Sequence, residues 1–306
     1  MNQDSPNITQ KEALEALKRS GYLLESRLES ILRQHEFRVE TNSLIPDDIT
    51  GRSREVDIWA GCARCNEFGP NKEGQLFLEL VVECVNPPQP IAFITKDRPD
   101  PLFEQKDFWD ALKLVGNPPE PAMPVHNMWS WLNSSLDLER FHHYWPGRIS
   151  TQYCSFSKKR GSSEWMAHHR DEDHETIRKL CLATDHYIRD CIVPGFVRTG
   201  AWALTLVYPV IVVGTSLYDV RPTKRSARIL KTQHINYRCS QSIHGESADY
   251  HIDVVTEAGF PRYLERVLRE FRLLSHRLHR KHGELTKLWY TRQRNLRRLA
   301  PEARGS

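Results

Sequence analysis

The chain has 306 residues, a formal net charge of +4, 39% hydrophobic residues and 27% charged residues. These values are typical of a globular protein, and the length allows one large domain or two small ones. The longest apolar run, 201–213, contains Pro209 and is too short to cross a bilayer, so no membrane partner is expected. The polar start indicates no secretory signal, and seven cysteines without a regular framework favour a reducing cytoplasm.

The first hundred residues predict two helical segments followed by strands. Hydrophobic residues recur at steps of three and four over 11–35, and Gly21 interrupts that pattern. Residues 37–40 begin a strand, 54–60 form a second, and the apolar run 75–86 forms a third. Turn-forming residues in the link 61–74 predict that the second and third strands pair as an antiparallel hairpin.

Each strand of this hairpin carries a carboxylate. Because side chains alternate between the two faces of a strand, Asp57 shares its face with Trp59, and Glu83 shares its face with Val81 and Val85. The hairpin brings Asp57 and Glu83 towards one end of the sheet. A buried carboxylate pair needs a countercharge, and a hard divalent cation such as Mg²⁺ or Mn²⁺ is the usual one.

This order of elements resembles the PD-(D/E)xK, or restriction-endonuclease-like, nuclease superfamily over roughly residues 12 to 96. The resemblance lies in the helical segment Gly21–Glu25, in Asp57, and in Val82–Asn86 with Glu83. It implies a metal site made by Asp57 and Glu83, with Glu25 as a third acidic group that orients water. It also implies phosphodiester hydrolysis in DNA, in restriction or phage defence, and leaves a homodimer open.

One departure from the superfamily pattern affects the chemistry. The lysine that such nucleases carry two residues after the glutamate is Val85 here. Removing a preorganised positive charge commonly costs orders of magnitude in rate. Two substitutes are conceivable: Lys96, which follows a neighbouring strand, and Asn86, whose side chain should face away from Glu83.

The rest of the chain predicts an insertion, more strands and a basic helix. We divide the whole chain into four parts: 1–100, the first part of the nuclease-like core; 101–195, a helical insertion; 196–258, strands that complete the sheet; and 259–306, a basic amphipathic helix and tail. Within the insertion, the run His168–Glu175 has zinc-ligand types but is more typical of the exposed start of a helix over 164–190. Asp253, inside a predicted strand, suits a structural hydrogen-bonding role.

Positive charge is concentrated near the end of the chain. Residues 262–298 contain 12 Lys and Arg against three Glu, so the remainder of the chain is net negative. This asymmetry suits a polyanion such as DNA, and the alternative is an ordinary solvated helix face. The candidate DNA-binding side chains are Arg292, Arg294, Arg297 and Arg298.

The sequence thus favours an α/β, restriction-endonuclease-like mixed sheet flanked by helices. Two functions remain open. One is a metal-dependent DNA endonuclease, for which Asp57 and Glu83 argue. The other is a catalytically impaired relative that binds nucleic acid or another protein, for which Val85 argues.

Overall fold

The computed structural model describes residues 8–47, 51–62, 66–68, 74–98, 113–116, 136–137, 141–145, 147–159, 161–169, 171–192, 202–243 and 245–299. Within these ranges the helices of more than two turns are α1 (Gln10–Ser20), α2 (Tyr22–Gln34), α6 (Asp171–His186) and α8 (Phe260–Leu299). A π-helical turn, η1 (Tyr187–Ile192), continues α6, and a 3₁₀ turn, η2 (Glu257–Gly259), precedes α8.

The strands of the described ranges form one mixed sheet of 13 strands. In chain order they are β1 (Phe37–Asp47), β2 (Arg52–Cys62), β3 (Asn66–Phe68), β4 (Gly74–Val85), β5 (Ile91–Asp97), β6 (Lys113–Gly116), β7 (Arg148–Lys158), β8 (Trp165–His168), β9 (Trp202–Val213), β10 (Leu217–Pro222), β11 (Ala227–Thr232), β12 (His234–Ile243) and β13 (Glu246–Thr256). The order across the sheet is β1-β2-β4-β9-β13-β12-β7-β5-β10-β11, and β3, β6 and β8 pair with β4, β9 and β7.

The centre of the sheet combines an antiparallel and a parallel pairing. β2 and β4 pair antiparallel, which confirms the predicted hairpin, and β4 and β9 run parallel over the full length of β4. β9 and β13 are also parallel. Strands after residue 196 therefore belong to the same sheet as β2 and β4.

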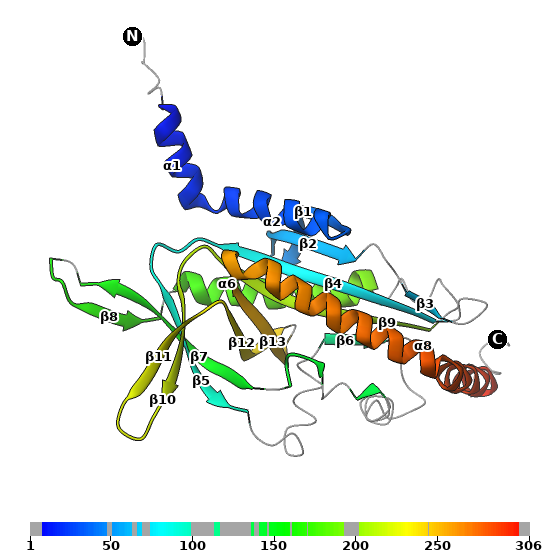
Figure 1. Cartoon of the computed structure of the whole chain (residues 1–306). Helices are drawn as coiled ribbons and strands as arrows, with labels where there is room; N and C mark the ends of the chain where they lie inside the picture. The colour runs from blue at the N-terminus through cyan, green and yellow to red at the C-terminus, as the bar shows by residue number, and fades with distance from the viewer. Residues whose placement is uncertain are drawn as a thin grey trace, which may run out of the picture.

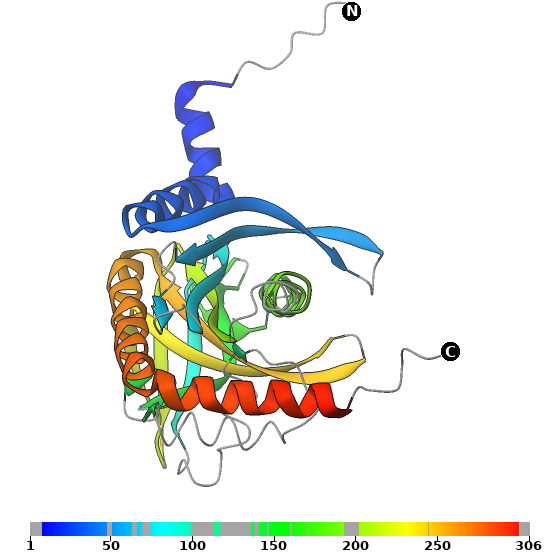
Figure 2. The ribbon, with the colours of Figure 1, turned by 90° about the vertical axis from the view of Figure 1, so that its right-hand side faces the viewer.

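The sheet separates two hydrophobic cores. One core contains apolar side chains of α2 and α8, such as Leu28 and Phe271, against one face of β4 and β9. The other contains Ile177 and Leu180 of α6 against the opposite face. Figure 2 shows α6 end-on, with the strands curving around it, while α2 and α8 lie along the outside (Figure 1).

The break between the first two helices lies where the sequence predicts it. Gly21 adopts φ +89°, a left-handed conformation that favours glycine, and it ends α1 and begins α2. The start of α1 is fixed by a capping box between Thr9 and Glu12. This turn directs α2 across β1 and β2.

The structure changes one of the sequence-based expectations and confirms another. The described part of 101–195 is not helical throughout, because it contributes β6, β7 and β8 to the sheet besides α6. In β7, inward-facing Ile149 and Tyr153 pack in the sheet. The predicted C-terminal helix is confirmed as α8, which runs continuously from Phe260 to Leu299. In the described part of the chain, we find no helix with the length and apolar character needed to cross a membrane.

Candidate active site

The backbone pairing between β2 and β4 stops where the predicted carboxylates lie. The two strands pair from Gly61 and Glu79 up to Ile58 and Val82. Beyond this point the side chain of Asp57 becomes the partner of β4, because its Oδ2 accepts the N–H of Cys84 at 2.6 Å. Asp57 is thereby fixed beside the end of β4.

Glu83 lies two residues before the end of β4, and its side chain is buried, with 2% of the residue exposed. Its neighbours on the same face, Val81 and Val85, pack in the α6 core, whereas Val82 and Cys84 pack in the core that contains α2. This is the division of faces that strand alternation predicts. Glu83 therefore points towards α6, and so the group that meets it must come from that helix.

That group is Lys179 of α6. Its Nζ contacts Oε2 of Glu83 directly and lies 3.3 Å from Oδ1 of Asp57. The side chains of Lys179 and Asp57 are 23% and 17% exposed, so solvent reaches the site on their side. Two carboxylates from neighbouring strands and one ammonium group from a helix thus meet at a single point.

Ion pairs hold α6 in the position that this contact requires. Arg178, the residue before Lys179, donates to buried Asp47 of β1 at 3.1 Å. Arg54 of β2 contacts both Asp47 and Glu175 of α6. Because Asp47 is buried, its two ion pairs fix the rotation of α6 about its axis more firmly than exposed pairs would.

The electrostatics of the site follow from burial and proximity. Burial, and then the negative charge of Asp57, raise the pKa of Glu83 well above its usual range. Burial alone would lower the pKa of Lys179, but Glu83 and Asp57 outweigh burial and raise this pKa. Lys179 is therefore an ammonium group at neutral pH and partly neutralises the carboxylates.

Glu25 lies near this cluster on α2 and is half-buried. Burial raises the pKa of Glu25, and the charges of Asp57 and Glu55 raise it further. The negative charge of Asp57 therefore acts on Glu25, although no hydrogen bond joins the two side chains. The resemblance predicts Glu25 as a third acidic group beside Asp57, and the turn at Gly21 directs the helix that carries Glu25 across β1 and β2.

The structure does not bring Lys96 to the carboxylates. Lys96 is exposed in β5, opposite Ile149 of β7. Across the sheet, β9, β13, β12 and β7 separate β5 from β4. An amine does lie beside Asp57 and Glu83, but it belongs to Lys179 and not to Lys96.

Asn86 is also directed elsewhere. Its side-chain amide donates to the backbone carbonyl of Lys18. A Cβ added at Gly214 would meet the Asn86 carboxamide at 2.4 Å, so this glycine is required by the close approach of Asn86. Asn86 therefore ties the end of β4 to the first helix and to the loop after β9.

The backbone of the predicted DNA-binding arginines forms the last turns of α8, but the structure does not describe their side chains. These residues are Arg292, Arg294, Arg297 and Arg298.

A second buried polar cluster lies away from the carboxylate pair. Potential ligand atoms lie within 4.8 Å of one another in two overlapping groups, one of His142, His143 and Glu270 and the other of His143, His234 and Asp253. These atoms already bond to each other: His143 bridges Glu270 at 2.7 Å and Asp253 at 2.9 Å. Asp253 has the structural hydrogen-bonding role that its place in a strand predicts.

Lys179 is the member of this cluster that the sequence analysis did not identify. The residues three and four positions later, Leu182 and Ala183, are both buried, so Lys179 lies over the inward face of its helix. A lysine in register with an apolar helix face, in a chain that lacks the motif lysine, is the signal by which Lys179 could have been found.

Comparison of the chain with family models, with curated proteins and with solved structures gives no match.

Proposed function

We propose that this protein is a restriction-endonuclease-like, metal-dependent nuclease that hydrolyses phosphodiester bonds in DNA. The observation that carries the proposal is the contact of Lys179 with both Asp57 and Glu83. It restores, from a helix, the amine that the sequence motif lacks. Val85 therefore no longer argues against catalysis.

The carboxylates fit a hard divalent cation. Oε1 of Glu83 is buried and has no hydrogen-bond partner among the described residues, which is costly for a carboxylate oxygen. Oxygen ligands of this kind are those that Mg²⁺ and Mn²⁺ prefer. Asp57 and Glu83 would hold the ion, and when bound it would lower the pKa of water and neutralise charge on the phosphate.

The residues of the chain perform the remaining steps. Because its pKa is raised, Lys179 stays protonated and acts as a hydrogen-bond donor to the attacking water or to a phosphate oxygen, not as a proton acceptor. Glu25, on the opposite side from α6, accepts a hydrogen bond from that water and orients it. Asp57 keeps its place through the N–H of Cys84.

The alternative function is a nucleic-acid-binding or protein-interaction module that has lost cleavage. The direct contact of Lys179 with both carboxylates favours it, because an ammonium group can be the countercharge that a metal would otherwise supply. The two functions differ in whether the cluster accepts a metal ion and cuts DNA.

Plasmid cleavage separates the two functions. We expect the purified protein to nick or linearise supercoiled plasmid in Mg²⁺ or Mn²⁺ and to be inactive in EDTA. Asp57→Asn and Glu83→Gln keep the size of each side chain and should each lower the rate by about a hundredfold or more. Glu164→Gln, at an exposed carboxylate, is the matched control and should cut normally.

Each outcome of this experiment decides between the functions. Cleavage that neither substitution reduces would remove the site assignment. No cleavage in any metal, together with salt-sensitive DNA binding, would favour the interaction module.

A further inference from the structure

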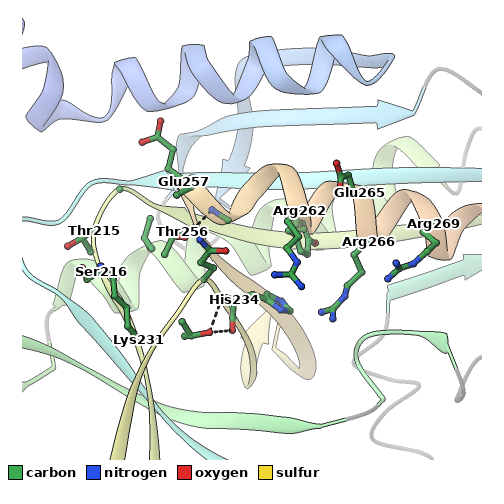
Figure 3. Close-up of a pocket in the computed structure, with 17 residues that line it drawn as sticks. Thr215, Ser216, Lys231, His234, Thr256, Glu257, Arg262, Glu265, Arg266 and Arg269 are labelled. Atoms are coloured by element: carbon green, nitrogen blue, oxygen red, sulfur yellow. Dashed lines mark hydrogen bonds between the residues drawn. The ribbon is translucent and has the colours of Figure 1, made fainter.

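A large pocket lies between the start of α8 and the ends of several strands. Its volume is about 1140 Å³, which is ample for a nucleotide-sized ligand. The walls come from the loop after β9, from the β11–β12 turn, and from η2 and the first turns of α8 (Figure 3). It shares no lining residue with the cluster of Asp57, Glu83 and Lys179.

The pocket is lined by positive charge from two sides. Arg262, Arg266 and Arg269 of α8 lie on one wall and Lys231 of β11 on another. All four are exposed, and none forms an ion pair within the described part of the chain. Of the two acidic lining residues, Glu257 is already bound by Arg27 at 3.0 Å. The pocket therefore presents a surplus of cations that are not neutralised.

The spacing of the arginines matches a ligand with more than one anionic group. They occur at steps of four and three residues, so they lie along one side of α8 and span roughly 10 Å of its axis. Figure 3 shows the side chains of Arg262 and Arg266 extending from α8 on the side where His234 lies. A single small anion would engage only part of this row.

His234 adds a directed polar group to the pocket. Its Nε2 lies 2.7 Å from Oδ1 of Asp253, whose other oxygen accepts a hydrogen bond from Tyr263 at 2.8 Å. Asp253 is fully buried, and His143 joins it to buried Glu270. Because Nε2 of His234 donates to Asp253, the nitrogen left for a ligand is Nδ1, which in the neutral ring accepts a hydrogen bond from a ligand N–H or O–H group.

The buried part of this network carries charge at neutral pH. Burial alone would lower the pKa of His143, but Asp253 and Glu270 raise it to about 9. His143 is therefore an imidazolium between two carboxylates, and it keeps Asp253 ionised as the acceptor for His234. The hydrogen bond to Asp253 therefore holds His234 in one orientation at the wall of the pocket.

We propose that this pocket binds the phosphate groups of a nucleotide, with Arg262, Arg266, Arg269 and Lys231 contacting phosphate oxygens and His234 completing the site. The ligand is either a free nucleoside polyphosphate or a stretch of a nucleic-acid strand, since both present consecutive phosphates. Guanidinium groups suit phosphate because they form paired, charge-assisted hydrogen bonds. The proposal does not depend on the nuclease function.

Binding is measured by fluorescence anisotropy at 150 mM salt in EDTA, which prevents cleavage. The probes are fluorescently labelled ATP and a labelled 12-nucleotide oligothymidylate. The double variant Arg266→Ala/Arg269→Ala removes two pocket cations, and Arg272→Ala/Arg280→Ala removes two exposed cations of α8 outside the pocket. The two variants have the same net charge.

We expect the pocket variant to weaken binding of at least one probe by about a hundredfold and the control variant to weaken it by less than about threefold. Loss of ATP binding identifies a free nucleotide as the ligand, and loss confined to the oligonucleotide identifies a strand. Equal weakening in both variants, or no measurable binding of either probe to the wild type, would overturn the proposal.

Glu83→Gln separates this proposal from the nuclease function. It should keep wild-type affinity for labelled ATP, because Glu83 does not line the pocket. A protein that binds ATP at the pocket but never cuts DNA would contradict the nuclease function alone.

Discussion

Lys179→Met should lower the rate of metal-dependent DNA cleavage by at least about a hundredfold, because it removes the only ammonium group seen to contact both Asp57 and Glu83 in the described structure. Methionine keeps most of the apolar stem, so the packing of α6 is retained. The rate is measured by plasmid nicking in Mg²⁺ under single-turnover conditions. Lys159→Met, which removes an exposed lysine after β7, should cut at the wild-type rate.

A second variant, which places a lysine on β4 in the Lys179→Met background, tests whether the position of the amine matters. Val85 lies on the same face as Glu83, so Lys179→Met/Val85→Lys places an amine where the superfamily motif has it. We expect the double variant to recover at least about tenfold of the rate that Lys179→Met loses. If Lys179→Met cuts as fast as the wild type, then Lys179 is only a structural countercharge.

Glu79→Gln should change the pH dependence of stability. Glu79 of β4 lies against Gly61, where an added Cβ would approach its Oε2 to 2.6 Å, and that oxygen is buried. Burial is the largest cause that raises the pKa of Glu79, from its ordinary value of 4.5 to about 8. The folded protein therefore holds Glu79 as a neutral acid over a pH range in which the unfolded chain ionises it.

The sign of the effect follows from these two pKa values. Below pH 4.5 Glu79 is neutral in both states, and its full contribution to stability is present. As the pH rises towards 8, the unfolded chain loses this proton first, so the free energy of unfolding falls by about 1.4 kcal/mol per pH unit. The loss is complete above the folded pKa.

Glutamine cannot ionise and should remove this slope. We expect Glu79→Gln to resemble the wild type near pH 5 and to be more stable by about 3 to 5 kcal/mol near pH 9, measured by urea unfolding. Glu164→Gln, at an exposed position, should shift the curve little at any pH. Parallel pH profiles of the wild type and Glu79→Gln would show that Glu79 is already ionised in the folded protein.

The parts of the site that lie close together in the sequence were predictable. Asp57 and Glu83 are joined by one hairpin, and alternation along a strand decides the face of each. Glu25 follows the helix break at Gly21, and only glycine readily takes the left-handed conformation found there. Local rules of geometry therefore led from the sequence to both carboxylates, whereas Glu25 was assigned by the resemblance to the nuclease superfamily.

The position of the amine depended on contacts between distant segments. Lys179 meets Glu83 only because α6 packs inside the curved sheet and is held there by Arg178 and Asp47. Lys96 is nearer to Glu83 in sequence but farther across the sheet, because β9, β13, β12 and β7 insert between β4 and β5. Strand order of this kind has no local sequence signal.

The polar pocket beside α8 could not be predicted either, because it also depends on contacts between segments that are distant in the sequence. A basic helix predicts affinity for polyanions, but the sequence does not show that Lys231 and His234 face the arginines at its start. Asp253, in contrast, was identifiable as a hydrogen-bonding group, since a carboxylate inside an apolar strand must find partners.

The most direct test of the central claim is the position of Mn²⁺ in crystals soaked in its chloride salt, found from its anomalous scattering. We predict a peak at coordination distance from both Asp57 and Glu83, and loss of that peak in Glu83→Gln. A peak only among His143, His234 and Asp253, or no peak in crystals of a protein that still cuts DNA, would contradict the assignment of the metal-dependent site.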